Sequence, residues 1–528
     1  MPVPDYDSEK FDTVTEGKAT ILFPKGNKVF YNPIQQFNRD LSIVGIRAWA
    51  QINKEEREKF AASQGPSKKR KRTDNTTSRI GDAAGSNENI PSSANISTDG
   101  PEPQNSKSKP YIRIIEALSA SGLRAIRYAK EIPDVKMVLA NDFSASAVKS
   151  IQENSAYNQT DSILVPNEGD ASAVMHTHKQ NPVHVVDLDP YGSAAPFVDA
   201  AVHAVTEGGL LIVTCTDLAV LAGNNYPEKC FALYGGTNLY GDAKHESALR
   251  LVLHMVATSA ARYGRAIEPL LSLSIDFYVR VFVRVKSSPI AVKENLSKTF
   301  LTYHCTGCGS LTTQNLGKVT RKPEKGSVKY GYGTGPTVPQ HCQHCGFVHH
   351  LGGPMWGHSI HNKEFVEKML AITKSLDPAV YGTLPRMEGM LTMVKNELDV
   401  PFYFSVSDVC SVLKSPVPPF KKFASALLNA GYKVSGSHAK PSCIKTDAPY
   451  SVIWDIIREI IKVDKNGDVS KLSPTSPGAK IVSTQTTTTI SFEDHPEAIE
   501  LEQLRKQKLV RYQESPPNWG PKSRAPKN

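Results

Sequence analysis

Hydrophobic and polar positions change their period near residue 112, and the change marks the most regular part of the chain. Short β-branched runs typical of strands then alternate with stretches of helical period. This alternation predicts βα units around a mostly parallel sheet, an α/β fold class. The expected strands are Ile112–Ala117, Val135–Asn141, Ile163–Val165, Val183–Asp187 and Gly209–Thr214. The expected helices are Gly122–Glu131, Ser144–Tyr157, Ala171–Thr177 and Ala194–Thr206.

The flanking patterns extend this domain in both directions. Residues Ala19–Phe30 predict two short strands around the turn Pro24–Asn27, and a helix follows from Asn38. Downstream, a long helix over His245–Tyr263 and late strands over Leu270–Val285 are expected to close the domain near residue 290.

Composition divides the chain further. Residues 62–109 are rich in Ser, Asn, Asp, Gly, Pro and Lys, so they cannot bury enough apolar surface to offset their ordering entropy, and a disordered insertion is expected. The full expected division is residues 1–61 joining the main domain, the insertion 62–109, the main domain 110–290, a cysteine-containing module 291–360, a small α+β domain 361–465 and a flexible tail 466–528.

Charge and targeting signals narrow the function classes. The formal charge of +10 and the pI near 9.0 favour a polyanionic partner, although basic tails alone supply part of the excess. No apolar run is long enough to span a bilayer and no signal peptide is evident, so a reducing compartment is expected for the eight cysteines. The basic run Lys68–Arg72 after Pro66 is typical of nuclear import signals, with a solvated charge run as the alternative and a mitochondrial pool left open.

Four successive strands of the main domain end in groups suited to one ligand. The first runs from Glu116 into the small residues Ser119–Gly122, and the second ends at Asp142, an acid placed to accept hydrogen bonds from ribose hydroxyls. The third is followed by Asp170 and Ala171, which offer an acid and a backbone amide to an adenine. Each feature alone is explained by ordinary helix capping, but an adenosyl ligand across the edge explains them together.

The first loop has no G-x-G-x-x-G pattern, so no pyrophosphate cradle is evident. S-adenosylmethionine carries no phosphates, and its chemistry therefore fits this edge better than a dinucleotide does.

The fourth strand ends in Asp189-Pro190-Tyr191, a turn that suits the exocyclic amine of a nucleobase. Such an amine is a poor nucleophile until both N–H groups donate to fixed acceptors, here the Asp189 carboxylate and the Pro190 carbonyl. Tyr191 would stack on the base. The proposed catalysis is therefore positioning and electrostatic preorganisation, after which Asp189 receives the proton.

Two C-x-x-C-G knuckles, Cys305–Gly309 and Cys342–Gly346, have the spacing of a tetrahedral zinc site. Four thiolates (Cys305, Cys308, Cys342, Cys345) leave no open position, so a structural Zn²⁺ is expected. A redox dithiol is the alternative. The flanking His304, His341 and His344 are less suitable ligands because both knuckles are complete.

At this point the chain resembles the tRNA (guanine-26-N2)-dimethyltransferase family. The similar segments are Glu116–Tyr128, Asn141-Asp142, Asp187–Ser193, Phe30–Pro33 with Asn38–Asp40, and Tyr234–Gly236. The resemblance covers Ala19 to about Trp454 apart from the insertion. It implies a Rossmann-like class I methyltransferase domain and a C-terminal domain peculiar to the family. Together with the cysteine knuckles and the pattern of the later residues, the expected fold also has a zinc-ribbon-like module and a small α+β C-terminal domain that binds tRNA.

The resemblance also implies residue roles and a reaction. The reaction is transfer of two methyl groups from S-adenosylmethionine to the N2 amine of guanine 26 in tRNA. Methyl-donor contacts are implied for Arg39, Arg124, Asp142, Asp170 and Ala171, a catalytic role for Asp189, and a wall of the guanine pocket for Phe30. The broader amine-methylating motif has two prolines after the acid where this chain has one, so the identity of the acceptor oxygens stays open. Arg39 and Arg124 as ion-pair partners and Phe30 as a core residue are the structural alternatives.

The expected RNA contacts are less specific. Lys- and Arg-containing Lys318–Lys329 with Tyr330 and Tyr332 would meet phosphates and unpaired bases, and the target guanine is expected to flip into the pocket. The C-terminal domain adds Lys414, Lys421, Lys422 and Lys433. Rival functions are an enzyme that methylates amines in DNA or another RNA, and a zinc-containing RNA-binding protein without catalysis. Which tRNAs are accepted, whether both methyls are added in one visit, and the oligomeric state stay open.

Overall fold

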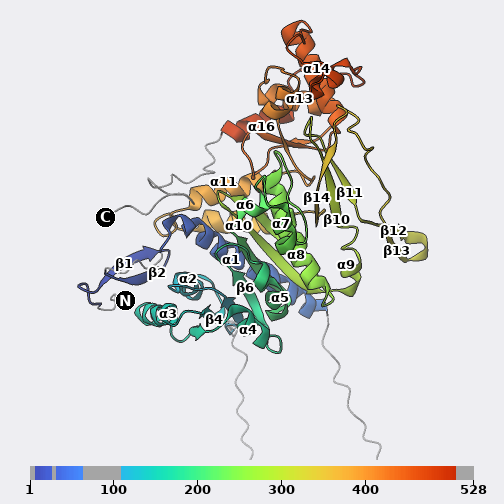
Figure 1. Cartoon of the computed structure of the whole chain (residues 1–528). Coiled ribbons are helices and arrows are strands. Elements are labelled where there is room, and N and C mark those ends of the chain that lie inside the picture. The colour runs from blue at the N-terminus through green and yellow to red at the C-terminus, as the bar shows by residue number, and fades with distance from the viewer. Residues whose placement is uncertain (1–5, 26–30, 64–108, 507–528) are drawn as a thin grey trace, which may run out of the picture.

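A seven-stranded sheet organises the first half of the chain in the computed structural model, which describes residues 6–25, 31–63 and 109–506 (Figure 1). Its strands run in the order β5-β4-β3-β6-β7-β9-β8. The strands are β3 (Ile112–Glu116), β4 (Val135–Asp142), β5 (Leu164–Glu168), β6 (Val183–Leu188), β7 (Val205–Cys215), β8 (Arg265–Ile275) and β9 (Tyr278–Ser287). Strands β3 to β7 are parallel, whereas β9 runs antiparallel to β7 and β8 antiparallel to β9. The expected α/β class is confirmed, and the strand order reverses between β3 and β6, where such sheets bind ligands.

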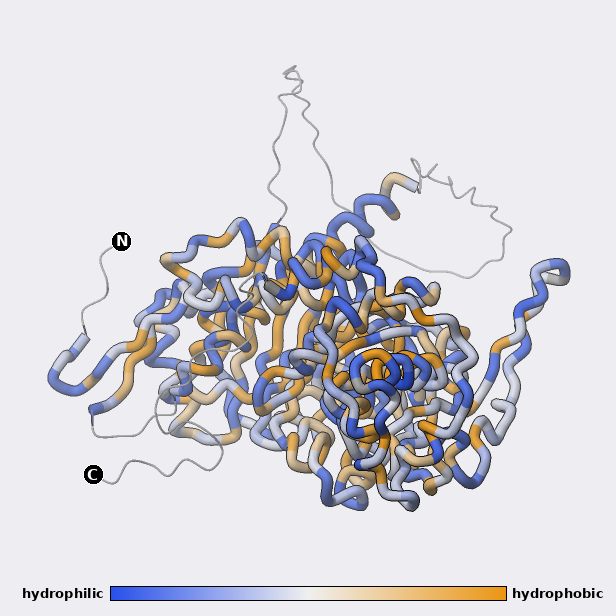
Figure 2. Tube along the Cα trace, turned by 90° about the horizontal axis from the view of Figure 1, so that it is seen from above, coloured by the Kyte–Doolittle hydropathy of each residue, from blue (hydrophilic) through white to orange (hydrophobic). Residues whose placement is uncertain are grey.

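Helices cover both faces of the sheet, because the strands are apolar on both sides. One core joins the sheet to α4 (Ala171–Thr177), α5 (Ala195–Ala204) and α8 (Lys244–Ala261). The opposite core joins it to α1 (Gln36–Ser63), α2 (Leu123–Glu131) and, through Ile151, α3 (Ala145–Tyr157). In Figure 2 the hydrophobic segments gather in the interior of the molecule, and hydrophilic segments dominate its outer loops.

The N-terminal hairpin differs from expectation. Strands β1 (Phe11–Glu16) and β2 (Ala19–Pro24) pair around Gly17-Lys18, and β1 was not predicted. The first predicted strand corresponds to β2, whereas most of the predicted turn at Pro24–Asn27 and the strand after it fall on residues 26–30, outside the described residues. Gly17 has φ of +59°, a conformation that favours glycine. Ala19, Ile21 and Phe23 alternate inward, so β2 lies against the main domain.

Helices α10 (Lys363–Ser375) and α11 (Leu384–Lys395) pack against α1 and extend the core of the sheet, with buried Phe365, Met369, Met387 and Leu391. This differs from the expected division, which assigned residues from 361 to a separate domain. The apolar face of a helix reveals that the helix is packed, but not which surface it packs against.

A second lobe contains three smaller sheets. Strands β10 (Thr299–Cys305), β11 (Leu311–Asn315) and β14 (His349–Trp356) form one, and the hairpin of β12 (Gly317–Lys322) and β13 (Ser327–Tyr332) projects from it (Figure 1). Strands β15 (Phe404–Ser405), β17 (Cys443–Thr446) and β16 (Val434–Ser435) form the third.

The remaining helices are η1 (Pro33–Gln35), α6 (Leu218–Leu221), α7 (Pro227–Tyr234), α9 (Pro289–Lys293), η2 (Pro323–Lys325), α12 (Val406–Val412), α13 (Phe420–Asn429), α14 (Tyr450–Lys465), α15 (Pro477–Ser483) and α16 (Pro496–Lys506).

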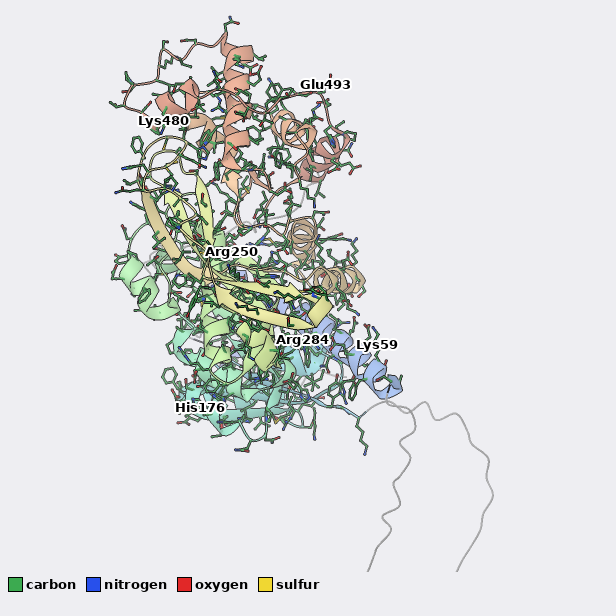
Figure 3. The ribbon with its side chains drawn as sticks, turned by 90° about the vertical axis from the view of Figure 1, so that its right-hand side faces the viewer. Lys59, His176, Arg250, Arg284, Lys480 and Glu493 are labelled. Carbon is green, nitrogen blue, oxygen red and sulfur yellow. The ribbon has the colours of Figure 1, made fainter. Side chains whose placement is uncertain are left out.

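The chain stays folded beyond residue 465, where a flexible tail was expected. Ile481 of α15 and Ala498 of α16 are buried in the core of the second lobe, and the Arg458 guanidinium donates to the Ile481 carbonyl. Lys480 and Glu493 accordingly lie on this lobe, at the end of the molecule away from His176 (Figure 3). The segment after residue 465 is rich in Thr and Ser because much of it forms loops, and a few buried apolar residues such as Ile481 and Ala498 hold these loops on the lobe. Residues 507–528 lie outside the described part, as does most of the expected insertion (64–108).

A buried ionic network joins the lobes. The Lys445 ammonium of β17 lies 3.0 Å from a Glu246 carboxylate oxygen of α8 and 2.9 Å from one of Glu397. Arg250, near the middle of the molecule in Figure 3, pairs with Glu246 at 2.7 Å. Because each charge is buried and paired, the lobes are fixed relative to one another. Across the described residues, no helix combines the length and apolarity needed to cross a membrane.

Candidate functional site

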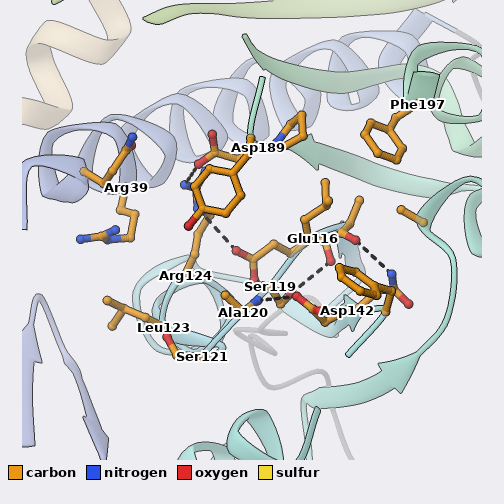
Figure 4. Close-up of a pocket in the computed structure, with 18 of the residues that line it drawn as sticks. Arg39, Glu116, Ser119, Ala120, Ser121, Leu123, Arg124, Asp142, Asp189 and Phe197 are labelled. Carbon is orange, nitrogen blue, oxygen red and sulfur yellow. Dashed lines mark hydrogen bonds and ion pairs between the residues drawn. The ribbon is translucent and has the colours of Figure 1, made fainter. Parts of the chain in front are cut away.

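A cavity of about 390 Å³ lies at the carboxyl ends of β3, β4, β5 and β6 (Figure 4). Apart from the cysteines, eight of the nine predicted site residues line it: Arg39, Arg124, Asp142, Asp170, Ala171, Asp189, Pro190 and Tyr191. The ninth, Phe30, falls outside the described residues. The residues come from segments more than 150 positions apart, and the parallel sheet brings them to one edge.

The loop between β3 and α2 forms the floor of the cavity. It passes through Ala120 and Gly122, whose φ angles are +48° and +78°, and the chain then enters α2 at Leu123. The tight turn leaves small side chains beside the cavity, so a ligand can approach the backbone here. The Cβ of any larger residue at Gly122 would lie about 3.2 Å from the Ile151 side chain.

Asp142 ties the ends of two strands together. One of its carboxylate oxygens accepts from the Ala120 amide at 2.9 Å, and the other accepts from the Ser144 amide at 3.0 Å. The carboxylate is thereby oriented at the rim of the cavity, where its remaining lone pairs can accept hydrogen bonds from vicinal hydroxyls.

The loop after β5 is held by the side-chain amide of Asn141, a residue of β4. Asn141 donates at 3.0 Å to both the Ala117 and Gly169 carbonyls, which fixes the spacing between the loops after β3 and β5. Asp170 caps α4 by accepting from the Ala173 amide at 2.8 Å. The capping role and a ligand-binding role are compatible, because only one oxygen of Asp170 is engaged in the cap.

The Asp189-Pro190-Tyr191 turn closes the fourth side. Gly192 follows with φ of +79°, and its amide donates to the Thr216 hydroxyl at 2.7 Å while its carbonyl accepts from the Thr216 amide at 2.8 Å. The turn is therefore pinned to the end of β7. Tyr191 is 79% exposed at the mouth of the cavity.

Arg124 organises the charges beneath the cavity. Its guanidinium donates to Asp189 and, at 3.1 Å, to Asp187, and its Nε lies 3.5 Å from Glu116 (Figure 4). Asp189 also accepts from the Asn38 amide at 3.3 Å. Two donors thus hold the Asp189 carboxylate in place.

Two buried acids behind Asp189 behave oppositely. Burial raises the pKa of Glu116 to about 8, against the opposing effect of Arg124. Burial alone would also raise the pKa of Asp187, but Arg280 and Arg124 together hold it below its usual range. Near pH 7 the cluster therefore contains a charged Asp187 and a mostly protonated Glu116, which limits like-charge repulsion around Asp189.

Arg39 lines the cavity from α1 but is itself in an ion pair. It contacts Glu16 of the N-terminal hairpin through Nε at 2.6 Å and donates to the Asn32 carbonyl at 3.1 Å. Glu16 also pairs with Arg127 at 2.7 Å. The hairpin thus positions the guanidinium of Arg39, an interaction that sequence patterns did not predict.

Several lining residues were missed by sequence reasoning. Phe143 follows Asp142 directly and is 80% exposed at the cavity, and Phe197 lines it from α5. An exposed aromatic residue after a strand-terminal acid was the available signal for Phe143. Tyr31 lies in the family-like segment Phe30–Pro33, which was the available signal for it, although Tyr31 itself was not singled out. Phe197 gave no comparable signal, because its contribution depends on how α5 packs.

The four knuckle cysteines gather into one buried cluster, in which all four sulfurs lie within 4.8 Å of one another. The Sγ atoms of Cys305 and Cys345 are 3.2 Å apart, and those of Cys308 and Cys342 are 3.8 Å apart. A tetrahedral site with Zn–S bonds of about 2.3 Å requires sulfurs roughly 3.8 Å apart. The donor set and its spacing therefore fit a zinc ion. None of His304, His341 and His344 belongs to this cluster.

A second cluster, His361, Glu397 and His438, does not fit a metal as well. The His438 ring is hydrogen-bonded to Glu397 at 2.7 Å through Nδ1 and accepts from the Ser274 amide through Nε2, and His361 Nδ1 accepts from the Ser272 amide. Three of the four ring nitrogens are already bonded, so the cluster serves the contact between the lobes.

Known proteins provide an independent comparison. A family model described as N2,N2-dimethylguanosine tRNA methyltransferase matches residues 9–458. A tRNA (guanine(26)-N(2))-dimethyltransferase of Schizosaccharomyces pombe is 50% identical over 520 residues, 97% of this chain and 92% of that protein. A mitochondrial protein of the same description from Saccharomyces cerevisiae is 47% identical over 545 residues, 99% and 93% of the two chains.

Among solved structures, the chain is similar to Trm1 from Pyrococcus horikoshii, determined with S-adenosyl-L-methionine. The sequences are 26% identical and the TM-score is 0.61, over 84% of this chain and 99% of that chain.

The raised pKa of Glu116 predicts a pH-dependent stability difference. Because the folded protein retains this proton from about pH 4.5 to about pH 8 and the unfolded chain does not, Glu116 lowers stability as pH rises through that window. The slope for one proton is about 1.4 kcal/mol per pH unit. Glu116→Gln mimics the protonated acid, so its melting temperature should rise relative to wild type between about pH 5 and about pH 8. The measurement is thermal unfolding across that range.

Glu153→Gln is the matched control, since Glu153 is an exposed carboxylate on α3. Its difference from wild type should not change with pH. A pH-independent effect of Glu116→Gln would contradict the protonated state assigned to Glu116.

Proposed function

The chain belongs to the family of S-adenosylmethionine-dependent tRNA (guanine26-N2)-dimethyltransferases, and from this premise we propose that the Asp189-Pro190-Tyr191 turn holds the guanine during methylation. The observation that carries the proposal is the position of the Asp189 carboxylate, which borders the cavity formed by four strand ends and is held by Arg124 and Asn38. N2,N2-dimethylation of guanine 26 in tRNA is the reaction of the family, and the residue roles below are our proposal.

The adenosyl end of the donor is assigned to the edge of β4 and β5. Asp142 would accept from the ribose hydroxyls, Asp170 from the adenine amine, and the Ala171 amide would donate to a ring nitrogen. Phe143 adds an exposed ring beside Asp142 that can stack on the adenine.

The amino-acid end of the donor is assigned to the side of the cavity lined by Arg39 and Arg124. Both guanidinium groups are buried and paired with acids, which holds them in place, so any hydrogen bond to the donor carboxylate would come from guanidinium groups of fixed position. S-adenosylmethionine, when bound, supplies an electrophilic methyl group next to Asp189.

The acceptor is assigned to Asp189 and Pro190. The guanine N2 amine would donate one hydrogen to the Asp189 carboxylate and the other to the Pro190 carbonyl, which directs the nitrogen lone pair away from the ring. An N–C bond forms as the methyl leaves sulfur, and the extra proton passes from the nitrogen to Asp189. The second methylation repeats these steps with the one remaining hydrogen.

Access of the guanine requires a flipped base, because guanine 26 lies within folded tRNA. Tyr191, exposed at the mouth of the cavity, is proposed to stack on the flipped guanine. A role for Phe30 in the guanine pocket stays a prediction, since Phe30 is outside the described residues.

The four-cysteine cluster is proposed to hold a structural Zn²⁺. Its cysteines are buried in the same core as α13 and α14, so a bound ion would stabilise the whole second lobe. Four thiolates satisfy the tetrahedral coordination of zinc and leave no position for a substrate.

The β12–β13 hairpin is proposed to contact the tRNA backbone. It extends from the second lobe and carries exposed Lys318, Lys322 and Lys329, with Tyr332 88% exposed at its base (Figures 1 and 2). Lys421 and Lys422, also expected to bind RNA, instead pair with Asp494 and Asp464. The hairpin is therefore the stronger of the two candidate surfaces.

Nuclear localisation remains a proposal that rests on Lys68–Arg72, which lie outside the described residues. One relative is described as mitochondrial. A mitochondrial pool of this protein is therefore proposed alongside the nuclear one.

The role of Asp189 predicts a selective loss of catalysis. Asp189→Asn keeps an oxygen and the shape of the turn but removes the charge that receives the proton. Methyl transfer to unmodified tRNA should fall by about 10²-fold or more, while S-adenosylmethionine binding changes little. Single-turnover transfer and calorimetric titration of the donor measure the two effects.

Asp199→Asn is the control, because Asp199 is an acid on α5 that bonds only Ser259 and Tyr263 among the described residues. It should transfer methyl groups at the wild-type rate. If Asp189→Asn still dimethylates tRNA efficiently, the catalytic assignment is wrong.

The zinc proposal predicts one bound metal per chain. Cys342→Ser should lose the ion and lower the melting temperature of the protein, whereas Cys410→Ser, a buried cysteine outside the cluster, should retain it. Metal analysis by mass spectrometry and thermal unfolding provide the readouts. A metal-free wild-type protein whose stability does not respond to a chelator would favour the redox alternative.

The hairpin proposal predicts a salt-dependent loss of affinity. Lys318→Ala with Lys329→Ala should weaken tRNA binding, and the slope of log K against log salt should fall by roughly 0.7–0.9 for each phosphate that the variant no longer neutralises. Binding is measured by fluorescence anisotropy at several salt concentrations. Lys136→Ala with Lys179→Ala, exposed residues of the first lobe, should leave the slope unchanged. Equal slopes for both double variants would contradict the proposal.

A further inference from the structure

Two side-chain amides continue the hydrogen bonding that begins at Asp189. Asn38 Nδ2 donates at 3.3 Å to Asp189 Oδ2 and at 2.8 Å to Gln35 Oε1. Gln35 is the last residue of η1 and lines the same cavity as Asp189. The methylation steps proposed above give Gln35 no role, although only one side chain separates it from the Asp189 carboxylate.

The Asp189 carboxylate sets the orientation of both amides. An ionised carboxylate only accepts hydrogen bonds, so Asn38 must turn its nitrogen toward Asp189. The second hydrogen of that nitrogen goes to Gln35, which must therefore turn its oxygen toward Asn38. The Gln35 nitrogen, Nε2, is left as a donor of two hydrogens.

This donor is open to a ligand. Gln35 is half-buried, and its Nε2 has no hydrogen-bond partner among the described residues. The atom is also not one of the unpaired side-chain atoms that are closed to solvent. A ligand in the cavity can therefore reach Nε2.

Asp189 is open on one side as well. Arg124 and Asn38 both donate to its Oδ2 atom, and in the described part of the chain Oδ1 has no partner. The Asp189 side chain is 16% exposed. One connected set of side chains thus offers the cavity an acceptor, Asp189 Oδ1, and a donor, Gln35 Nε2.

The Watson–Crick edge of guanine carries the complementary groups. Its N2 amine and N1–H are donors, and O6 on the same edge is an acceptor. Adenine has an amine and an acceptor nitrogen on this edge but no oxygen. Enzymes that flip a base read it through hydrogen bonds to this edge. A donor close to Asp189 would therefore distinguish guanine from adenine.

We propose that Gln35 Nε2 donates to O6 of the guanine whose amine is held at Asp189, and that this bond helps the enzyme to select guanine. The inference rests on the proposed function, because O6 can face Gln35 only while Asp189 holds the amine of the same base.

Two other side-chain amides line the cavity and are less suited to this role. Asn141 uses its nitrogen to bond the Ala117 and Gly169 carbonyls. Asn32 caps η1 by accepting from the Ile34 amide at 3.0 Å, and no hydrogen bond in the described structure joins its side chain to Asp189.

The test compares two tRNAs that differ only at base 26, which is guanine or 2-aminopurine. 2-Aminopurine retains the N2 amine and lacks O6. The measured quantity is the ratio of kcat/KM for the two tRNAs, in wild type and in Gln35→Met. The preference for guanine should fall by about threefold to tenfold in the variant, because only guanine loses a hydrogen bond.

The ratio has internal controls. The N1–H that 2-aminopurine also lacks affects both enzymes equally, and unfolded protein lowers both rates of one preparation equally. Gln36→Met is the matched variant, since Gln36 is the next residue, is also half-buried and does not line the cavity. Its preference should equal that of wild type.

Gln35→Glu provides a second test, because it keeps an oxygen for Asn38 and replaces the donor by an acceptor. A tRNA with 2,6-diaminopurine at position 26 presents an amine in place of O6. Relative to guanine, its kcat/KM should rise by about threefold or more in this variant compared with wild type.

Two results would overturn the inference and leave the proposed function intact. The first is an unchanged base preference in both Gln35 variants, which would mean that Gln35 only positions Asp189 through Asn38. The second is weaker donor binding with the base preference retained, which would assign Gln35 to the methyl donor. If Asp189→Asn remains fully active, the proposed function itself fails.

Discussion

The buried guanidinium of Arg124 is the interaction on which the rest of the site depends. It contacts Asp189 and Asp187 and lies beside Glu116, so three acids from neighbouring strands share one cation. Without it, parallel strand ends that carry acids would repel one another across a low-dielectric edge. The protonation of Glu116 and the second cation, Arg280, complete the balance. The sheet can therefore present the Asp189 carboxylate at its edge, where we propose that the guanine amine is held, without destabilising the edge.

Buried ion pairs also connect segments that are distant in the sequence. Glu16 brings the N-terminal hairpin to Arg39 and Arg127, and Lys445 joins the two lobes through Glu246 and Glu397. Each ion pair is directional, and removal of one partner would leave the other charge buried and uncompensated. These networks fix the relative positions of the strand ends that line the cavity, the cysteine module and the β12–β13 hairpin. A rigid substrate such as tRNA can contact all three only if their relative positions are fixed.

Sequence patterns predicted the parts of the fold that depend on local period. The βα alternation located α4 at Ala171–Thr177 and the strand ends that line the cavity. These features could be predicted because the spacing of apolar residues along the sequence differs between strands and helices. Sequence could not predict contacts between remote segments. The pairing of Arg39 with Glu16, the packing of α10 and α11 on the first lobe, and the burial of Ile481 beyond the expected boundary all depend on tertiary packing.

The central claim is that the guanine amine is held by oxygens at the end of β6 while the methyl donor lies along the neighbouring strand ends. A structure of the full-length protein with tRNA and a non-reactive donor analogue tests this most directly. The account predicts the guanine 26 base outside its stack, with N2 at a hydrogen-bond distance of about 2.7–3.2 Å from both the Asp189 carboxylate and the Pro190 carbonyl. A guanine that remains stacked in the tRNA, or whose N2 points away from Asp189 in the presence of the analogue, would contradict it.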